Sequence, residues 1–266
     1  MKLQAVIFDW AGTLADHGSR APVSALLSIF SAAGVPISIG EARLSMGLAK
    51  KSHIESILAI PRVREAWAGL RGAPPTQMDA DELYAHFIPQ QLACLESHSE
   101  LIDGVPSLAA RLRARGLKIG TTTGYTRPML DYLLDRARAQ GFAPDFSACP
   151  DEVPFGRPAP YMCYLNAIHL QAHPLWTIVK IGDTPVDIEE GLNAGMWTIG
   201  ISRTGNEVGL TSAEWDAAPE NEKQLLLSAA EEKLIAAGAH YVARSVADCD
   251  SILDSIQARL DLGGRP

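Results

Sequence analysis

The chain has 266 residues, of which 47% are hydrophobic and 20% charged, so it has the composition of an ordinary globular protein with enough length for a sizeable core. The formal net charge of −8 argues against a nucleic-acid partner, because an acidic surface repels phosphates. The 4 cysteines lack metal-site or redox spacing, and no apolar run reaches the length of a membrane span. Because residues 1–4 lead directly into the first strand, we expect no signal peptide. The lack of a long apolar run predicts no membrane partner, and the cysteine spacing predicts reduced thiols in a cytoplasmic location.

The first predicted element is a short buried strand, residues 5–8, which ends at Asp9. Its four consecutive apolar residues are typical of an interior strand of a parallel sheet, which is buried on both faces. In open α/β sheets the chemistry lies at the carboxyl ends of such strands, and Gly12 allows the backbone to turn tightly there. Asp9 is therefore a candidate nucleophile, although an aspartate after a strand is also a common turn or helix-capping residue.

The next part of the chain is predicted to be entirely helical. Helices are expected over residues 23–33, 39–46, 49–58, 61–70 and 80–95, with a helix-breaking linker at 71–76. A helical insertion directly after the first strand indicates a separate cap domain that closes over a site and excludes water. We therefore expect a cap at residues 19–98 and a core made of residues 1–18 and 99–266.

The remainder alternates between helices and strands, which predicts βαβ units and a parallel sheet with helices on both faces. Strands are expected at 117–121, near Phe146, at 177–181, at 197–201 and at the edge position 241–243. Helices are expected at 105–115, 128–139, 158–169, 185–194, 210–237 and 246–260. The fold class is α/β. Two of these strands end, like the first, in polar residues: Thr123-Gly124 after one, and Asp183 with Asp187 after the other.

The three strand ends offer a carboxylate, a hydroxyl and a carboxylate pair. This pattern resembles the motifs of the haloacid dehalogenase (HAD) superfamily of phosphotransferases, whose first motif supplies an aspartate nucleophile. Ala11 stands where the phosphatases of that superfamily have a second aspartate. In this respect the sequence from Asp9 to Thr13 resembles the phosphonatase family. The resemblance implies a Rossmann-like core with an inserted helical cap. It also implies hydrolysis of the C–P bond of 2-phosphonoacetaldehyde to acetaldehyde and phosphate, in phosphonate degradation.

The resemblance also implies roles for the residues at the strand ends. Asp9 attacks phosphorus, and Mg²⁺ is held by Asp9, the Ala11 carbonyl and Asp183, with Asp187 nearby; carboxylate oxygens are the ligands that Mg²⁺ prefers. Asp187 fits a first-turn helix residue equally well. Thr123 and Arg157 interact with phosphoryl oxygens, and the substrate-binding residues are Thr13, Gly124, Tyr125 and Ser19. The alternative for Arg157 is a surface arginine before a proline turn.

A cap lysine completes the predicted chemistry. Ala11 cannot donate a proton, so a phosphate ester would lose roughly 10²–10⁴ in rate, whereas a carbon leaving group is stabilised when its carbonyl becomes a protonated imine. The segment from Met46 to His53 resembles the family segment that carries the Schiff-base lysine, and its alignment selects Lys50. Neighbours on a helix point about 100° apart, so only one of Lys50 and Lys51 faces inward. Lys50 must also have a depressed pKa, since an ordinary lysine is a solvated cation.

The resemblance assigns Met46 and His53 to the catalytic surroundings of Lys50, with His53 relaying protons; a core methionine and a satisfied core histidine are the structural alternatives. Leu14 and Ser19 depart from the family pattern and bear on substrate preference. The rival functions are a phosphomonoesterase or phosphoglucomutase-like enzyme of the same superfamily, a hydrolase of a related phosphonoaldehyde, and a silent binding protein that keeps the fold. A homodimer formed through the cap is also implied.

Overall fold

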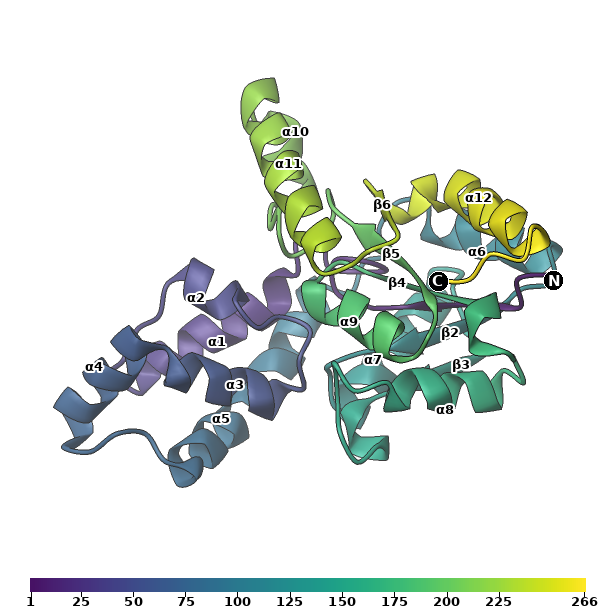
Figure 1. Ribbon diagram of the computed structural model, residues 1–266. Coiled ribbons are helices and arrows are strands. Elements are labelled where there is room, and N and C mark those ends of the chain that lie inside the picture. The colour runs from purple at the N-terminus through teal and green to yellow at the C-terminus, as the bar shows by residue number, and fades with distance from the viewer.

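The structure is a computed structural model that describes residues 1–266, and it is built around one six-stranded sheet in which every neighbouring pair of strands is parallel (Figure 1). The strand order is β3-β2-β1-β4-β5-β6, so the first strand of the chain lies at the centre. The strands are β1 (Ala5–Phe8), β2 (Lys118–Thr122), β3 (Phe146–Ala148), β4 (Ile178–Gly182), β5 (Trp197–Ile201) and β6 (Tyr241–Ala243). The predicted α/β fold with a Rossmann-like parallel sheet is confirmed.

The apolar sequence of β1 is explained by burial on both of its faces. Val6 and Phe8 belong to the main hydrophobic core, while Ala5 and Ile7 belong to a second, smaller core on the opposite face. Because β1 pairs with β2 on one side and β4 on the other, no edge of it is exposed. The prediction that this run is an interior strand is therefore correct, and the chain leaving it at Asp9 emerges in the middle of the sheet.

Helices cover both faces of the sheet, as the βαβ alternation predicts. Helices α6 (Val105–Ala114), α7 (Arg127–Ala139) and α12 (Cys249–Asp261) contribute to the main core, and α8 (Tyr161–His169) contributes to the smaller one. Helix α9 (Pro185–Asn193) packs against β4 and β5. The short 3₁₀ turns are η1 (Pro150–Glu152), η2 (Leu175–Thr177) and η3 (Val246–Asp248).

The helices between β1 and α6 lie to one side of the sheet, at the left of Figure 1. They are α1 (Arg20–Ala32), α2 (Ile39–Arg43), α3 (Lys50–Ala59), α4 (Pro61–Arg71) and α5 (Gln77–Ser97). Helices α1 and α3 both pack against α5, around buried side chains that include Phe30 and Phe87. We call these residues, 20–97, the helical segment. Helix α2 ends at Arg43, earlier than predicted, because the chain turns through residues 44–48 with Gly47 at a φ of 96°.

The C-terminal third departs from prediction in one respect. The expected helix over 210–237 is two helices, α10 (Ser212–Ala217) and α11 (Glu220–Ala236), because Ala218 and Pro219 adopt extended backbone between them. Helix α11 projects away from the sheet (Figure 1). None of the helices combines the length and apolar character that crossing a membrane requires.

Candidate active site

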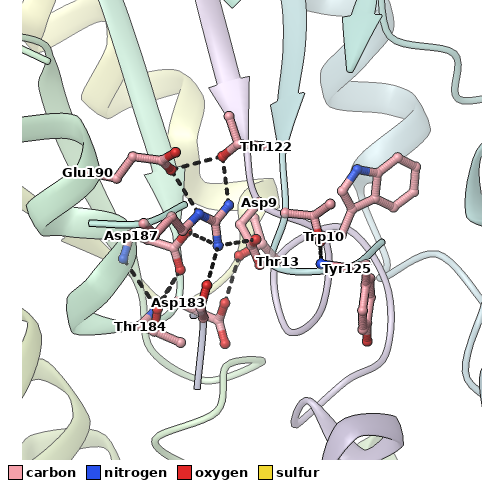
Figure 2. A network of polar contacts seen from close by, with 12 residues as sticks. Asp9, Trp10, Thr13, Thr122, Tyr125, Asp183, Thr184, Asp187 and Glu190 are labelled. Atoms are coloured by element: carbon pink, nitrogen blue, oxygen red, sulfur yellow. Dashed lines mark hydrogen bonds and ion pairs between the residues drawn. The ribbon is translucent and has the colours of Figure 1, made fainter. Parts of the chain in front are cut away.

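The carboxyl ends of three neighbouring strands bring the predicted polar residues together. Asp9 follows β1, Thr123 follows β2 and Asp183 follows β4, and β1 lies between the other two strands in the sheet. Each of these side chains is buried, with at most 5% of the residue exposed. Figure 2 shows Asp9, Asp187 and Glu190 joined by polar contacts to one guanidinium, with Asp183 beside them and bonded to Thr13. The position of β1 in the sheet therefore makes this strand end the meeting point of the site.

Three carboxylates form the acidic centre of the network. One oxygen from each of Asp9, Asp183 and Asp187 lies within 4.8 Å of the other two. Burial raises the pKa of Asp9, and the charge of Asp187 raises it further. Burial likewise raises the pKa of Asp183 well above its usual range, with additional repulsion from Asp9 and Asp187. In both groups burial is the main cause of the raised pKa, and repulsion between the neighbouring carboxylates adds to it.

Asp187 is the most fully engaged of the three. One of its oxygens accepts from Lys180 Nζ at 2.7 Å and from Arg157 Nη1 at 2.8 Å. The other accepts from the hydroxyl and the backbone N–H of Thr184, in the capping box that begins α9. Burial alone would raise the pKa of Asp187, but Arg157 and Lys180 outweigh it and lower the pKa. Both oxygens are thus already occupied by donors, which favours a supporting position over direct metal ligation.

Asp183 is held by two hydroxyl groups from the loop after β1 and by one backbone N–H that follows β5. The Thr13 hydroxyl donates to Oδ1 at 3.2 Å, the Ser19 hydroxyl donates to Oδ2 at 3.2 Å, and the Asn206 N–H donates to Oδ2 at 2.7 Å. Gly12, at a φ of 80°, lets the loop after Asp9 run against this carboxylate. Thr13 and Ser19, which are expected at the substrate, both contact Asp183.

Arg157 connects the carboxylates to residues that the sequence did not reveal. Its Nη1 lies 2.7 Å from Asp9 Oδ1, its Nε donates to Glu190 Oε2 at 2.9 Å, and its Nη2 donates to Thr122 Oγ1 at 2.6 Å. Thr122 donates in turn to Glu190. Arg157 is therefore not the surface arginine of the alternative interpretation. Its guanidinium is buried and fixed in orientation by partners on three sides.

Lys180 and Glu190 were missed although the sequence carried a signal for each. Lys180 interrupts the otherwise apolar strand β4, and a lysine inside a fully buried strand needs an anionic partner. Glu190 lies three residues after Asp187 on α9, so the two carboxylates share one helix face. Burial lowers the pKa of Lys180, but Asp187 and Glu190 outweigh it, and the pKa is raised overall.

The residues after β2 bring the helical segment into contact with the sheet. The Thr123 hydroxyl accepts the Tyr125 N–H at 3.1 Å. A Cβ at Gly124 would clash with the carbonyl of Leu48, so glycine permits this close approach. Tyr125 is buried, its hydroxyl has no hydrogen-bond partner, and its ring centroid lies 4.8 Å from Lys50 Nζ. These three residues therefore join the strand end to the helix that carries Lys50.

The two neighbouring lysines have opposite environments, as helix geometry requires. Lys50, at the start of α3, is 5% exposed and forms no ion pair. Burial lowers its pKa to about 8; the charge of Asp9 opposes this shift and that of Arg157 reinforces it. Lys51 instead lies at the surface, with Nζ 2.6 Å from Asp81. Only Lys50 has the partly neutral amine that an attack on a carbonyl needs.

Met46 and His53 are both buried residues of the helical segment. Met46 is part of the main core. His53 is fully buried, and neither ring nitrogen has a hydrogen-bond partner. Burial lowers the pKa of His53 to about 3, and the charge of Lys50 lowers it further, so the ring is neutral near pH 7. A contact with the Ala42 backbone partly opposes this shift, so the neutral ring has one backbone neighbour and no side-chain partner.

The charges of the network suit a divalent cation bound by oxygen. Four buried carboxylates, Asp9, Asp183, Asp187 and Glu190, lie in this network, and two buried cations, Arg157 and Lys180, form ion pairs with three of them. Glu190 Oε1 also has no partner. A hard cation such as Mg²⁺ prefers such oxygen ligands. Ala11 lies in the loop directly after Asp9, where its backbone bridges to Ala15.

Comparison with known proteins gives consistent results along the whole chain. The sequence profile of the haloacid dehalogenase-like hydrolases matches residues 3–195. A phosphonoacetaldehyde hydrolase of Syntrophobacter fumaroxidans is 44% identical over 264 residues, covering 99% of this chain and 95% of that protein. A phosphonoacetaldehyde hydrolase of Paraburkholderia xenovorans is 45% identical over 264 residues, covering 99% of each.

A solved structure is similar over the full length. The crystal structure of a phosphonoacetaldehyde hydrolase like protein from Oleispira antarctica superposes with a TM-score of 0.98 at 39% identity. It covers 100% of this chain and 96% of that one. The similarity thus includes both the sheet and the helical segment.

Proposed function

The chain belongs to the haloacid dehalogenase-like hydrolases and, within them, to the phosphonoacetaldehyde hydrolase family, and from this premise we propose the route by which it hydrolyses the C–P bond of 2-phosphonoacetaldehyde. The products are acetaldehyde and phosphate. In the proposed route Lys50 forms an imine with the aldehyde, and Asp9 accepts the phosphoryl group. The two residues come from separate parts of the chain, so the reaction depends on their meeting over the substrate.

We propose that residues 19–98 form the cap and that residues 1–18 with 99–266 form the core. Helices α1 and α3 both pack against α5, which supports this division, and the buried side chains of the helical segment continue into the main core. The chain crosses between the two parts near Ser19 and again after Ser97. Two such crossings permit a hinge, and closure would exclude water from the carboxylates.

The first step is attack by the neutral Lys50 amine on the aldehyde carbon, and loss of water gives the imine. The depressed pKa of Lys50 supports this role because it leaves part of the amine neutral near pH 7. When the imine is protonated, its nitrogen withdraws electrons from the adjacent carbon. His53, buried and neutral three residues along the same helix, is proposed to relay the proton.

The second step is attack by an Asp9 oxygen on phosphorus. The P–O bond forms as the C–P bond breaks, and the electron pair of the C–P bond moves into the carbon framework to give an enamine on Lys50. No protein acid is needed to protonate a leaving alkoxide, which agrees with Ala11 in the place of a second aspartate. Arg157, which lies against Asp9, is proposed to exchange that contact for a phosphoryl oxygen. Thr123 and Gly124 are proposed to hold other phosphoryl oxygens.

Asp9, the Ala11 carbonyl and Asp183 are proposed to hold Mg²⁺, with Asp187 in support. When bound, the ion would neutralise charge where an anionic nucleophile meets an anionic phosphonate. The excess of buried carboxylates over paired cations around these residues supports this assignment. The remaining steps restore the enzyme: water hydrolyses the aspartyl phosphate at Asp9, the enamine is protonated at carbon, and water releases acetaldehyde from Lys50.

The observation that carries the proposal is a buried, unpaired Lys50 amine on a helix held next to the strand end of Asp9. The test is borohydride reduction in the presence of phosphonoacetaldehyde, followed by peptide mapping. We expect a stable adduct on Lys50 in the parent and in Lys51→Ala, and none in Lys50→Ala. Label on Lys51, or an unlabelled parent that still releases phosphate, would contradict the imine route.

The oligomeric state and the cellular location stay predictions. We propose that the protein forms a homodimer through the cap, which analytical ultracentrifugation of the parent would test. We also propose a cytoplasmic location, where the 4 free cysteines would remain reduced. Fractionation of cells that produce the protein would test it.

A further inference from the structure

Arg43, the last residue of α2, reaches from the helical segment to a loop on the other side of the site. Its Nη1 donates to the carbonyl of Gly18 at 2.8 Å and to Asn206, at 3.1 Å to the carbonyl and 2.9 Å to Oδ1. Its Nη2 donates to the carbonyl of Gly209 at 3.0 Å. No carboxylate forms an ion pair with this guanidinium, so its partners are neutral oxygens. Such an arrangement recognises backbone geometry rather than charge.

The loop that receives Arg43 follows β5, and we call residues 202–210 the β5 loop. Gly209 has a φ of 69°, and a Cβ there would lie 2.7 Å from Arg43 Cζ, so only glycine leaves room for the guanidinium. Asn206 returns a contact from its Nδ2 to the Arg43 carbonyl at 3.5 Å. Arg43 and Asn206 are therefore bonded in both directions across the boundary between the helical segment and the β5 loop.

The opposite side of the β5 loop contacts the acidic centre. The backbone N–H of Asn206 donates to Asp183 Oδ2 at 2.7 Å, and this is the shortest of the three hydrogen bonds to that carboxylate. Gly205 also packs directly on Asp183, since a Cβ there would lie 2.6 Å from the aspartate Cβ. The Thr204 hydroxyl donates to the Gly12 carbonyl at 2.7 Å. The β5 loop is thus enclosed between Arg43 and Asp183.

We propose that Arg43 is a positioning residue that couples the docking of the helical segment on the core to the orientation of the metal-binding carboxylate Asp183, through Asn206. When the helical segment lies against the core, the guanidinium fixes Asn206, and the N–H of Asn206 fixes Asp183. The same segment carries Lys50, so imine chemistry and phosphoryl chemistry become ready together. The inference rests on the proposed role of Asp183 in holding Mg²⁺. By thermodynamic linkage, a metal ion bound at Asp183 stabilises the docked helical segment by the same free energy as docking adds to metal binding.

The direct test measures equilibrium binding of Mn²⁺, used in place of Mg²⁺, to the substrate-free protein. Electron paramagnetic resonance reports the bound and free Mn²⁺. Hydrogen-bond partners of metal ligands typically contribute roughly 10–100-fold to metal affinity, so we expect Arg43→Ala to bind Mn²⁺ about 10-fold more weakly than the parent. Arg43→Lys restores the charge but not the forked geometry, and is expected to recover only part of the affinity. Arg64→Ala is the matched control, because Arg64 is an exposed arginine on α4 without a side-chain partner.

Asn206→Ala provides a second route that leaves α2 unchanged. It removes the Oδ1 acceptor, and we expect weaker Mn²⁺ binding that does not add to the effect of Arg43→Ala in the double variant. Near-parental affinity in both folded single variants, or full additivity, would overturn the proposal. A parent protein that binds no Mn²⁺ would instead refute the metal assignment of the proposed function. Circular dichroism of each variant separates these results from loss of folding.

Discussion

The pH dependence of imine formation tests the environment of Lys50 most directly. Burial sets its pKa at about 8 against an ordinary value of 10.5. At pH 7 the neutral fraction is then about 9%, compared with about 0.03% for an ordinary lysine, a gain of roughly 300-fold. Below pH 8 the amine is mostly protonated, so the rate of imine formation should rise about tenfold for each pH unit. Above pH 8 it should level off.

The assay is the rate of borohydride-dependent inactivation by phosphonoacetaldehyde between about pH 6 and pH 10. Tyr125→Ala is the perturbing variant, because the Tyr125 ring lies 4.8 Å from Lys50 Nζ and helps to exclude water. It should move the midpoint from about 8 toward 10.5 and slow trapping at pH 7 by up to roughly 300-fold. Lys51→Ala should keep the parental profile. A parental rate that keeps rising with constant slope to pH 10.5 would refute the desolvated amine.

Four other outcomes follow from the same contacts. Lys50→Met should be inactive, yet its free energy of unfolding at pH 7 should be up to about 3 kcal/mol higher, because the folded protein disfavours the Lys50 ammonium. This stability difference should shrink as the pH rises from about 8 to 10.5. An unchanged thermal midpoint at pH 7 would contradict the prediction. Glu190→Gln should lower kcat and reduce the free energy of unfolding by about 3 kcal/mol in urea titrations, because Arg157 and Lys180 each lose a buried anionic partner. Parental values would contradict a contribution of these ion pairs to stability and activity. Removing divalent cations with EDTA should lower the thermal midpoint of the parent more than that of Asp183→Asn, and equal shifts would argue against a metal at this carboxylate. Phosphate monoesters should be hydrolysed roughly 10²–10⁴-fold more slowly than phosphonoacetaldehyde, because Ala11 supplies no proton; comparable rates in a phosphate-release screen would favour the phosphatase alternative.

The sequence by itself determined the fold class and the location of the chemistry. The apolar run Ala5–Phe8 required burial on both faces, and only an interior parallel strand provides it. Polar residues after three such strands then indicated one shared edge of the sheet, and the sequence around Lys50 separated it from Lys51. These inferences succeed because they depend on local periodicity and on where strands end.

The tertiary structure alone decided which side chains touch. Glu190 and Thr122 contact Arg157, and Lys180 contacts Glu190, because the central position of β1 brings the ends of β2 and β4 together. No local sequence pattern reveals that convergence. Ser19 contacts Asp183 although 164 residues separate them. Arg43 reads as an ordinary helix-end arginine until the β5 loop lies against it. Contacts between distant segments depend on the order of the strands and on how the helical segment docks against the core. Both are properties of the folded chain.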